Sequence, residues 1–264
     1  MNTVSSSILR HPASPALGRN VITVASGKGG VGKTWFSVTL AHALARAGRR
    51  VLLFDGDLGL ANVDLQLGLA LKGDLDSVLA QRIEIEDAVT RYEPGGFDIV
   101  AGRSGSGSLA ALPASHLTGL RDSLVALAAG YDTAIVDLAA GVEQAVRILS
   151  SAAALRLVVT TDEPTALTDA YAFIKVTTIR ANAASTRIVV NMATNETEGR
   201  HTYGTLSKAC QNFLGMTPAL AGVVRRDRHV REAIRSQTPL LTRYPNCDAA
   251  ADVESIARTL VEPR

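Results

Sequence analysis

The sequence is poor in cysteine, in net charge and in long apolar runs, and each shortage removes a class of protein from consideration. Two of the 264 residues are cysteines, Cys210 and Cys247, and no CxxC spacing joins them, so the pattern indicates neither a disulfide framework nor a zinc site. A net charge of +2 at pH 7 is too small to predict a nucleic acid or an anionic membrane as partner. Any such partner would have to bind a local patch of charge.

No apolar stretch approaches the length that spans a bilayer, and the N-terminus lacks the charged and then apolar order of a signal peptide. We therefore expect a cytoplasmic protein. The histidines show no ligand spacing, and the sequence assigns no role to them; they are His11, His42, His116, His201 and His229.

The sequence does contain a regular alternation of short apolar runs with helical patterns. After a flexible tail over residues 1–19, residues 20–264 are long enough for one large domain. Nearly continuous apolar strands separated by helices predict a single three-layer α/β domain, whose mostly parallel sheet is covered by helices on both faces. The expected strands cover residues 20–25, 50–54, 97–101, 133–137, 155–160, 186–192 and 219–224, and the expected helices 35–47, 74–81, 86–90, 114–129, 142–151, 165–180, 204–213 and 249–261, with a surface loop over 102–108.

The first apolar run leads directly into a glycine-rich stretch that reads GKGGVGKT and then into a helical pattern. Glycines let successive backbone N–H groups point at one anion, and the following helix directs its positive N-terminal end to the same place. In this strand-to-helix context the pattern is that of a P-loop for a nucleoside triphosphate. The residues expected to bind the nucleotide here are Gly27, Lys28, Gly29, Gly30, Val31, Gly32, Lys33 and Thr34.

Chemistry-bearing side chains follow two of the expected strands as well as the loop. Lys33 would reach the β- and γ-phosphates, and the Thr34 hydroxyl would ligate Mg²⁺. Asp55 and Asp57 stand just past a strand, where they can hold magnesium-bound water or orient an attacking water. Asp137 ends another apolar strand and can bind magnesium through water. Capping of a short helix is the alternative interpretation of the Asp55–Asp57 pair.

The KGGVGKT core, with its additional lysine Lys28, resembles the deviant Walker A loop of the MinD/ParA group of ATPases. The stretch DGDLGLANVD that begins at Asp55 is similar to the group's DxDxGLxNxD segment, and closer still to the flagellar-number regulators, its FlhG/FleN branch. DLAAG from Asp137 resembles the DxPAG segment, with Ala139 in place of proline or glycine. VVNM, which contains Asn191, and TTDEPTALTDAY, which contains Glu163, match two further segments of the group.

This resemblance implies roles for individual residues. Lys28 acts across an ATP-dependent homodimer and reaches the nucleotide of the other subunit, and Asp57 positions the hydrolytic water. Asp55 supports the magnesium shell, Glu163 touches the ribose in the opposite subunit, and Asn191 recognises the adenine edge. Lys28, Lys33 and Asp57 are then the catalytic residues, Thr34, Asp55, Asp57 and Asp137 the magnesium residues, and ATP and Mg²⁺ the cofactors.

The resemblance covers residues 20–262 and implies a slow ATPase that controls flagellar number or placement. Its partners would be flagellar regulatory or assembly proteins. Its location would be the cytoplasm, or peripherally the inner membrane or cell pole. Septum-site positioning, chromosome or plasmid partitioning and a scaffold without turnover stay open as alternative functions.

Only Leu9–Arg10 fits the GTPase-activating DQAxxLR segment of the flagellar branch. The helix over 252–262 has no cationic face for lipid, and we expect it to pack on the core. DNA binding would use Arg225, Arg226, Arg228, Arg231 and Arg235, which Asp227 and Glu232 dilute.

Overall fold

The structure, a computed structural model, describes residues 18–102, 112–180 and 185–261. Most of the expected tail, with Leu9–Arg10, and most of the expected loop after Gly102 lie outside these residues. Within them, no helix has both the length and the apolar character needed to cross a bilayer.

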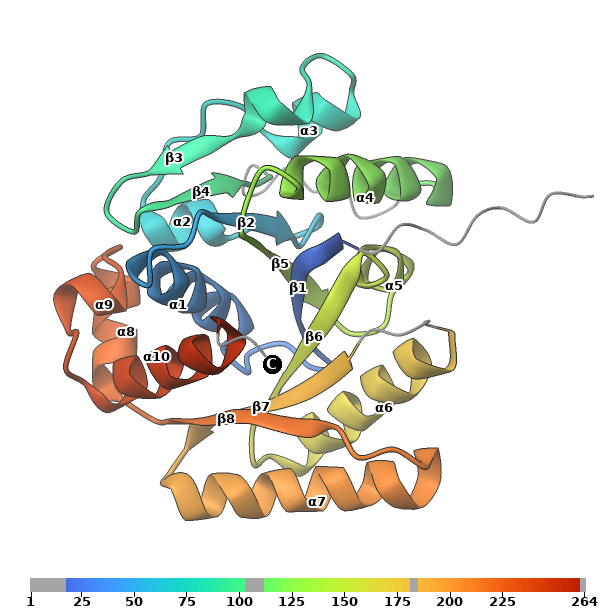
Figure 1. Ribbon diagram of the computed structural model, residues 1–264, viewed down its shortest axis with the longest axis vertical. Coiled ribbons are helices and arrows are strands. Elements are labelled where there is room, and N and C mark those ends of the chain that lie inside the picture. The colour runs from blue at the N-terminus through green and yellow to red at the C-terminus, as the bar shows by residue number, and fades with distance from the viewer. Residues whose placement is uncertain (1–17, 103–111, 181–184, 262–264) are drawn as a thin grey trace, which may run out of the picture.

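Eight strands of the described chain form one sheet in the order β3-β4-β2-β5-β1-β6-β7-β8 (Figure 1). Neighbouring strands run parallel throughout, except that β3 is antiparallel to β4 at one edge. The prediction of a mostly parallel sheet is therefore confirmed. The strands are β1 (Gly18–Ser26), β2 (Val51–Gly56), β3 (Thr90–Tyr92), β4 (Phe97–Val100), β5 (Thr133–Ala140), β6 (Ala153–Thr160), β7 (Ser185–Ala193) and β8 (Ala219–Arg225).

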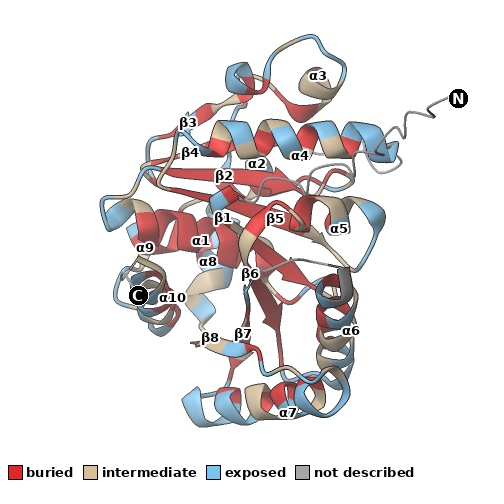
Figure 2. Cartoon of the chain, turned by 45° about the vertical axis from the view of Figure 1, so that its right-hand side comes forward, coloured by how far each residue is buried: buried red, intermediate tan, exposed pale blue. Residues whose placement is uncertain are grey.

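Helices cover both faces of this sheet and close two apolar cores over it, one with α4 to α7 and the other mainly with α1, α9 and α10. Figure 2 shows that buried residues concentrate in the strands and on the inner sides of the helices. The three-layer prediction is confirmed. The helices are α1 (Lys33–Arg46), α2 (Val63–Leu67), α3 (Leu75–Leu79), the 3-10 helix η1 (Ile85–Ala88), α4 (Ala114–Ala128), α5 (Gln144–Ser150), α6 (Pro164–Arg180), α7 (Glu196–Leu214), α8 (Arg228–Arg235), α9 (Leu240–Arg243) and α10 (Asp248–Val261).

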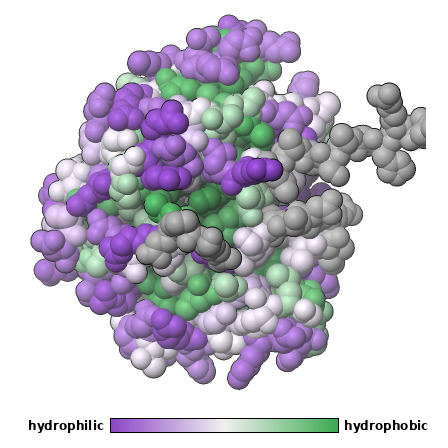
Figure 3. Space-filling model, in the orientation of Figure 1, coloured by the Kyte–Doolittle hydropathy of each residue, from purple (hydrophilic) through white to green (hydrophobic). Residues whose placement is uncertain are grey.

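The sheet is covered because its strands are apolar on both sides. Every residue of β2 is buried, as a central parallel strand between two helical layers requires. In Figure 3, hydrophilic residues are prominent over α3 at the top of the molecule, whereas hydrophobic residues gather toward the middle of the face.

Several boundaries differ from the sequence-based expectation. Strand β1 begins at Gly18, whose N–H donates to the Ala152 carbonyl (2.9 Å), so the expected tail is too long by two residues. Helix α7 begins at Glu196 and not at 204, because the Asn195 side chain accepts a hydrogen bond from the Glu198 N–H and caps the helix there. The first eight residues of the helix are polar or weakly apolar, so their periodicity does not reveal it. Strand β3 and helices α2, α8 and α9 were not predicted, since segments this short have too little periodicity to detect.

Helix α10 packs on the core, as expected from the lack of a cationic face. Its apolar stripe is buried against α1 and β8, and its outward charges include Glu254, which pairs with Arg46 of α1 (3.0 Å). The buried residues are Ala249, Ala250, Val253, Ile256 and Ala257.

One buried histidine of α1 makes the stability of the protein sensitive to acid. His42 is 6% exposed, and burial, with a smaller contribution from Arg46, lowers its pKa from 6.5 to about 4. The unfolded chain therefore takes up a proton at His42 well before the folded protein does as the pH falls. We expect the free energy of unfolding to fall by about 2 kcal/mol from this group between pH 7 and pH 4.5.

The variant His42→Leu should not show this component, as measured by the difference in urea unfolding between the two pH values. His201→Gln, on the exposed side of α7, is the matched control and should behave as the wild type. Equal pH dependence of the wild type and His42→Leu would contradict the prediction.

Candidate functional site

The glycine-rich loop joins the carboxyl end of β1 to α1. Gly30 and Gly32 both have φ of +83°, a conformation that favours glycine and turns the backbone amides inward. Helix α1 has no side-chain cap and no acidic residue in its first turn. The N–H groups at its N-terminus are therefore left for an anion from outside the helix.

Asn191, at the end of β7, supports this loop from below. Its Nδ2 donates to the Val31 carbonyl (2.8 Å), its Oδ1 accepts from the Met192 N–H (2.9 Å), and the residue is 2% exposed. A Cβ atom at Gly32 would lie 2.5 Å from Asn191 Nδ2. The structure thus gives Asn191 a supporting role that the sequence did not suggest, and the adenine contact stays a prediction.

Lys33 lies in a buried charged network with β5. Its Nζ donates to Asp137 Oδ1 (3.0 Å), which also accepts from the Ser37 hydroxyl (2.8 Å). Asp137 is fully buried, and its Oδ2 has no hydrogen-bond partner among the residues that the structure describes. A buried carboxylate oxygen without a partner costs free energy, so a magnesium-bound water fits there. Ser37 was missed from the sequence, although it stands one helical turn after Lys33.

Asp55 is brought next to Asp137 by the register of β2 and β5, which pairs these two residues. Burial and the Asp137 carboxylate raise the pKa of Asp55 to about 7, although three backbone N–H groups oppose this shift. Its oxygens accept from the N–H groups of Asp57 (3.1 Å), Asn62 (3.1 Å) and Val63 (3.2 Å). Asp55 therefore organises the loop after β2, and a divalent cation nearby would favour its ionised form.

Asp57 lines a cavity of about 320 Å³ that runs over the glycine loop. Its Oδ1 accepts from the Leu60 N–H (3.0 Å), so the carboxylate caps its own loop and still faces the cavity. Lys28, Lys33 and Thr34 line the same cavity, and Gln66 and Ile234 were not expected there. The lining does not include four of the predicted site residues, Asp55, Asp137, Glu163 and Asn191.

Lys28 turns toward α6 rather than into the loop. Its Nζ lies 2.6 Å from Glu163 Oε2 and 2.9 Å from Thr165 Oγ1, and its side chain is 38% exposed. The Lys28 ammonium holds the pKa of Glu163 below its ordinary value. The structure thus joins, within one chain, two residues that the resemblance directs toward the nucleotide of the other subunit.

The sequence also missed a cluster at the N-terminus of α8. Asp227, His229 and Cys247 place one potential ligand atom each within 4.8 Å of one another. The Asp227 carboxylate already caps α8 by accepting from the His229 N–H (2.9 Å) and pairs with His229 Nδ1 (2.8 Å). These contacts explain the cluster as a helix cap.

The glycine loop lies at the carboxyl edge of a parallel sheet, with lysines beside it and buried carboxylates beneath it. This arrangement is the site of a P-loop nucleoside triphosphatase. Comparison with known families gives the same class more narrowly, because the model of the CobQ/CobB/MinD/ParA nucleotide binding domain matches residues 22–240. The chain belongs to this family and is an ATPase that uses ATP with Mg²⁺.

Individual relatives match along most of the chain. The antiactivator FleN of Pseudomonas aeruginosa is 40% identical over 238 residues, which cover 90% of this chain and 85% of FleN. The flagellum site-determining protein YlxH of Helicobacter pylori is 29% identical over 91% of this chain and 81% of its own length. Among solved structures, the septum site-determining protein MinD of Pyrococcus horikoshii, complexed with Mg-ADP, superposes with a TM-score of 0.77 at 25% identity, covering 92% of this chain and 96% of MinD.

Proposed function

We propose that this ATPase is a spatial regulator that dimerises with ATP and controls flagellar number or placement through flagellar regulatory or assembly proteins. The observation that carries the proposal is the similarity to FleN, which covers 90% of this chain; FleN is named an antiactivator. YlxH, a second relative of similar coverage, is named for determining the site of the flagellum.

Dimerisation is supported by exposed apolar side chains near the nucleotide cavity. Ile234 of α8 lines this cavity and is 37% exposed, and Lys28 lines it as well. Leu60 (73% exposed) and Val142 (38% exposed) follow the lining residues Asp57 and Ala140 by three and two positions. Large exposed apolar side chains are typical of a surface that a partner covers.

Within the site, we assign the steps of hydrolysis to the residues of this chain as follows. Lys33 neutralises phosphate charge, and Asp57 accepts a hydrogen bond from the attacking water and orients it. Thr34, Asp57 and Asp137 would hold Mg²⁺, with Asp55 keeping the Asp57 loop in place. Bound Mg²⁺ supplies positive charge that offsets the charge on the transferring phosphoryl oxygens.

The partitioning alternative loses support from the contacts of Arg225. This residue pairs with Asp248 (2.9 Å) and Asp252 (2.8 Å) of α10 and so serves to fix β8 to the helix. An arginine committed to two carboxylates contributes little to a phosphate-binding patch. We therefore expect no ATP-dependent shift of random duplex DNA.

The test is a count of flagella per cell by electron microscopy after deletion of the gene in the organism that encodes the chain. Loss of an antiactivator should raise the number, and the wild-type gene should restore it, whereas Lys28→Ala should not. Lys208→Ala, an exposed lysine of α7 away from the cavity, is the matched control and should restore the number. An unchanged flagellar count together with misplaced septa or lost chromosomes would overturn the proposal in favour of an alternative.

A further inference from the structure

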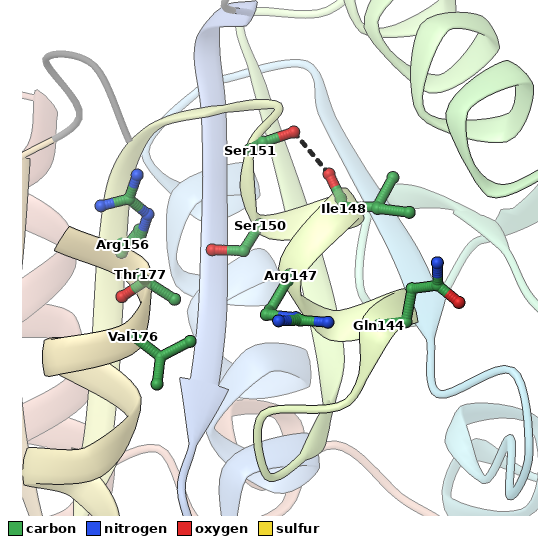
Figure 4. A pocket seen from close by; sticks show the side chains of 8 residues that line it. All are labelled: Gln144, Arg147, Ile148, Ser150, Ser151, Arg156, Val176 and Thr177. Atoms are coloured by element: carbon green, nitrogen blue, oxygen red, sulfur yellow. Dashed lines mark hydrogen bonds between the residues drawn. The ribbon is translucent and has the colours of Figure 1, made fainter. Parts of the chain in front are cut away.

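A second cavity, of about 310 Å³, lies on the opposite side of β6 from α1, between α5 and α6 (Figure 4). It shares no lining residue with the cavity over the glycine loop. The lining includes Arg147, Ile148 and Ser150 of α5, Arg156 of β6, and Val176 and Thr177 of α6. Nothing in the proposed ATPase function uses these side chains.

Arg156 is the unusual member of this lining. It is 2% exposed, and among the described residues it makes no ion pair and its buried Nε has no hydrogen-bond partner. Burial lowers the pKa of its guanidinium, because the charged form loses its hydration there. Arginine is almost never fully buried unless it is paired, since an uncompensated charge in an apolar environment is costly.

A second buried polar group faces the same space. Ser150 is 1% exposed, and its hydroxyl also has no hydrogen-bond partner within the described part of the chain. Figure 4 shows Ser150 on α5 and Arg156 on β6 on either side of the gap, with Thr177 of α6 next to Arg156. The Thr177 hydroxyl is already bonded to carbonyls of its own helix, so two donors, one of them charged, remain unused.

The rest of the lining limits what could satisfy these donors. Arg147, which is exposed, adds a second positive charge at the mouth, and no acidic side chain lines the cavity in the described residues. Ile148 and Val176 offer apolar walls on the two helices. A planar guanidinium binds a carboxylate or phosphate with two parallel hydrogen bonds, which a water molecule cannot replace.

We infer that the cavity between α5 and α6 binds a small organic oxyanion, a carboxylate or phosphate ester with a short apolar chain. Its oxygens accept from the Arg156 guanidinium and the Ser150 hydroxyl, and its apolar part lies against Ile148 and Val176. The ligand enters past Arg147, which draws anions to the mouth. This site shares no lining residue with the nucleotide site.

The test is isothermal titration of the full chain with hexanoate, hexyl phosphate, inorganic phosphate and hexanol, in saturating Mg²⁺ and ADP so that the glycine loop is filled. We expect saturable binding of hexanoate or hexyl phosphate, none of hexanol, and weaker binding of inorganic phosphate. The tighter of the two six-carbon probes identifies the head group. Binding of neither probe, or binding of hexanol as tight as that of the anions, would overturn the inference.

Arg156→Met should weaken binding of the better probe by at least about tenfold, as loss of a charge-assisted bidentate pair does. Removal of a buried unpaired charge should leave the melting temperature unchanged or higher, so this variant is expected to fold. Val176→Phe fills the cavity, leaves Arg156 in place and should abolish binding. This variant tests the site if Arg156→Met does not fold. Arg231→Met, an exposed arginine of α8, is the control and should bind as the wild type. Wild-type affinity in Arg156→Met or in Val176→Phe would refute the site.

Discussion

Replacing Lys28 by alanine should produce a protein that still binds ATP but does not form the ATP-dependent dimer. In one chain the Lys28 ammonium is shared between Glu163 (2.6 Å) and Thr165 (2.9 Å), at an exposed position beside the cavity. An exposed ion pair of this kind contributes little to stability, so the lysine can leave it for the more concentrated charge of a triphosphate. Removal of the ammonium leaves the nucleotide of the other subunit without that contact.

Analytical ultracentrifugation with ATP and Mg²⁺ measures this result, and an Asp57→Ala background prevents hydrolysis during the run. Lys208→Ala removes an exposed positive charge of α7 and should dimerise as the wild type. Glu163→Gln removes the charge that holds Lys28 in its own chain, and we expect dimers at lower ATP concentration. A dimer that persists in Lys28→Ala would eliminate the role of Lys28 across the interface.

Replacing Asp57 by alanine should lower the rate of ATP hydrolysis by about 10²-fold or more, the usual effect of removing a group that positions or activates a nucleophile. Asp57 is the carboxylate that lines the cavity, whereas Asp55 beneath it is committed to three backbone N–H groups. In the presence of ATP the dimer of this variant should accumulate, because its dissociation requires hydrolysis of the bound ATP. Single-turnover release of phosphate measures the rate.

The variant Asp57→Asn separates catalysis from loop structure. Its amide oxygen can still accept from the Leu60 N–H, the contact that Asp57 Oδ1 makes at 3.0 Å, but it carries no charge. We expect Asp57→Asn to lose hydrolysis as fully as Asp57→Ala. Asp64→Asn, in the same segment and outside the lining of the cavity, should keep the wild-type rate. An unaltered rate in Asp57→Ala would remove this residue from catalysis and favour a scaffold without turnover.

Prediction of the fold from sequence succeeded where elements are long and their apolar pattern is clear. The strands at 51–56 and 133–140 and the helix at 114–128 were expected within a few residues, because burial on both faces leaves an unbroken apolar run. It failed at β3, where three residues pair antiparallel with β4, and at α8 and α9, which have only eight and four residues. Such segments are held by their neighbours and not by their own periodicity.

The sequence by itself determined the glycine loop, Lys33, Thr34 and the acids at the ends of two strands, because phosphate binding depends on consecutive backbone amides and on residues a few positions apart. Only the tertiary structure decided which distant side chains meet there. Asn191 supports Val31 across 160 positions of the chain, and Lys28 meets Glu163 across 135. Among the described residues, Arg156 is buried without a partner for the same reason. The order and register of the parallel strands set these contacts, and no local pattern encodes that order.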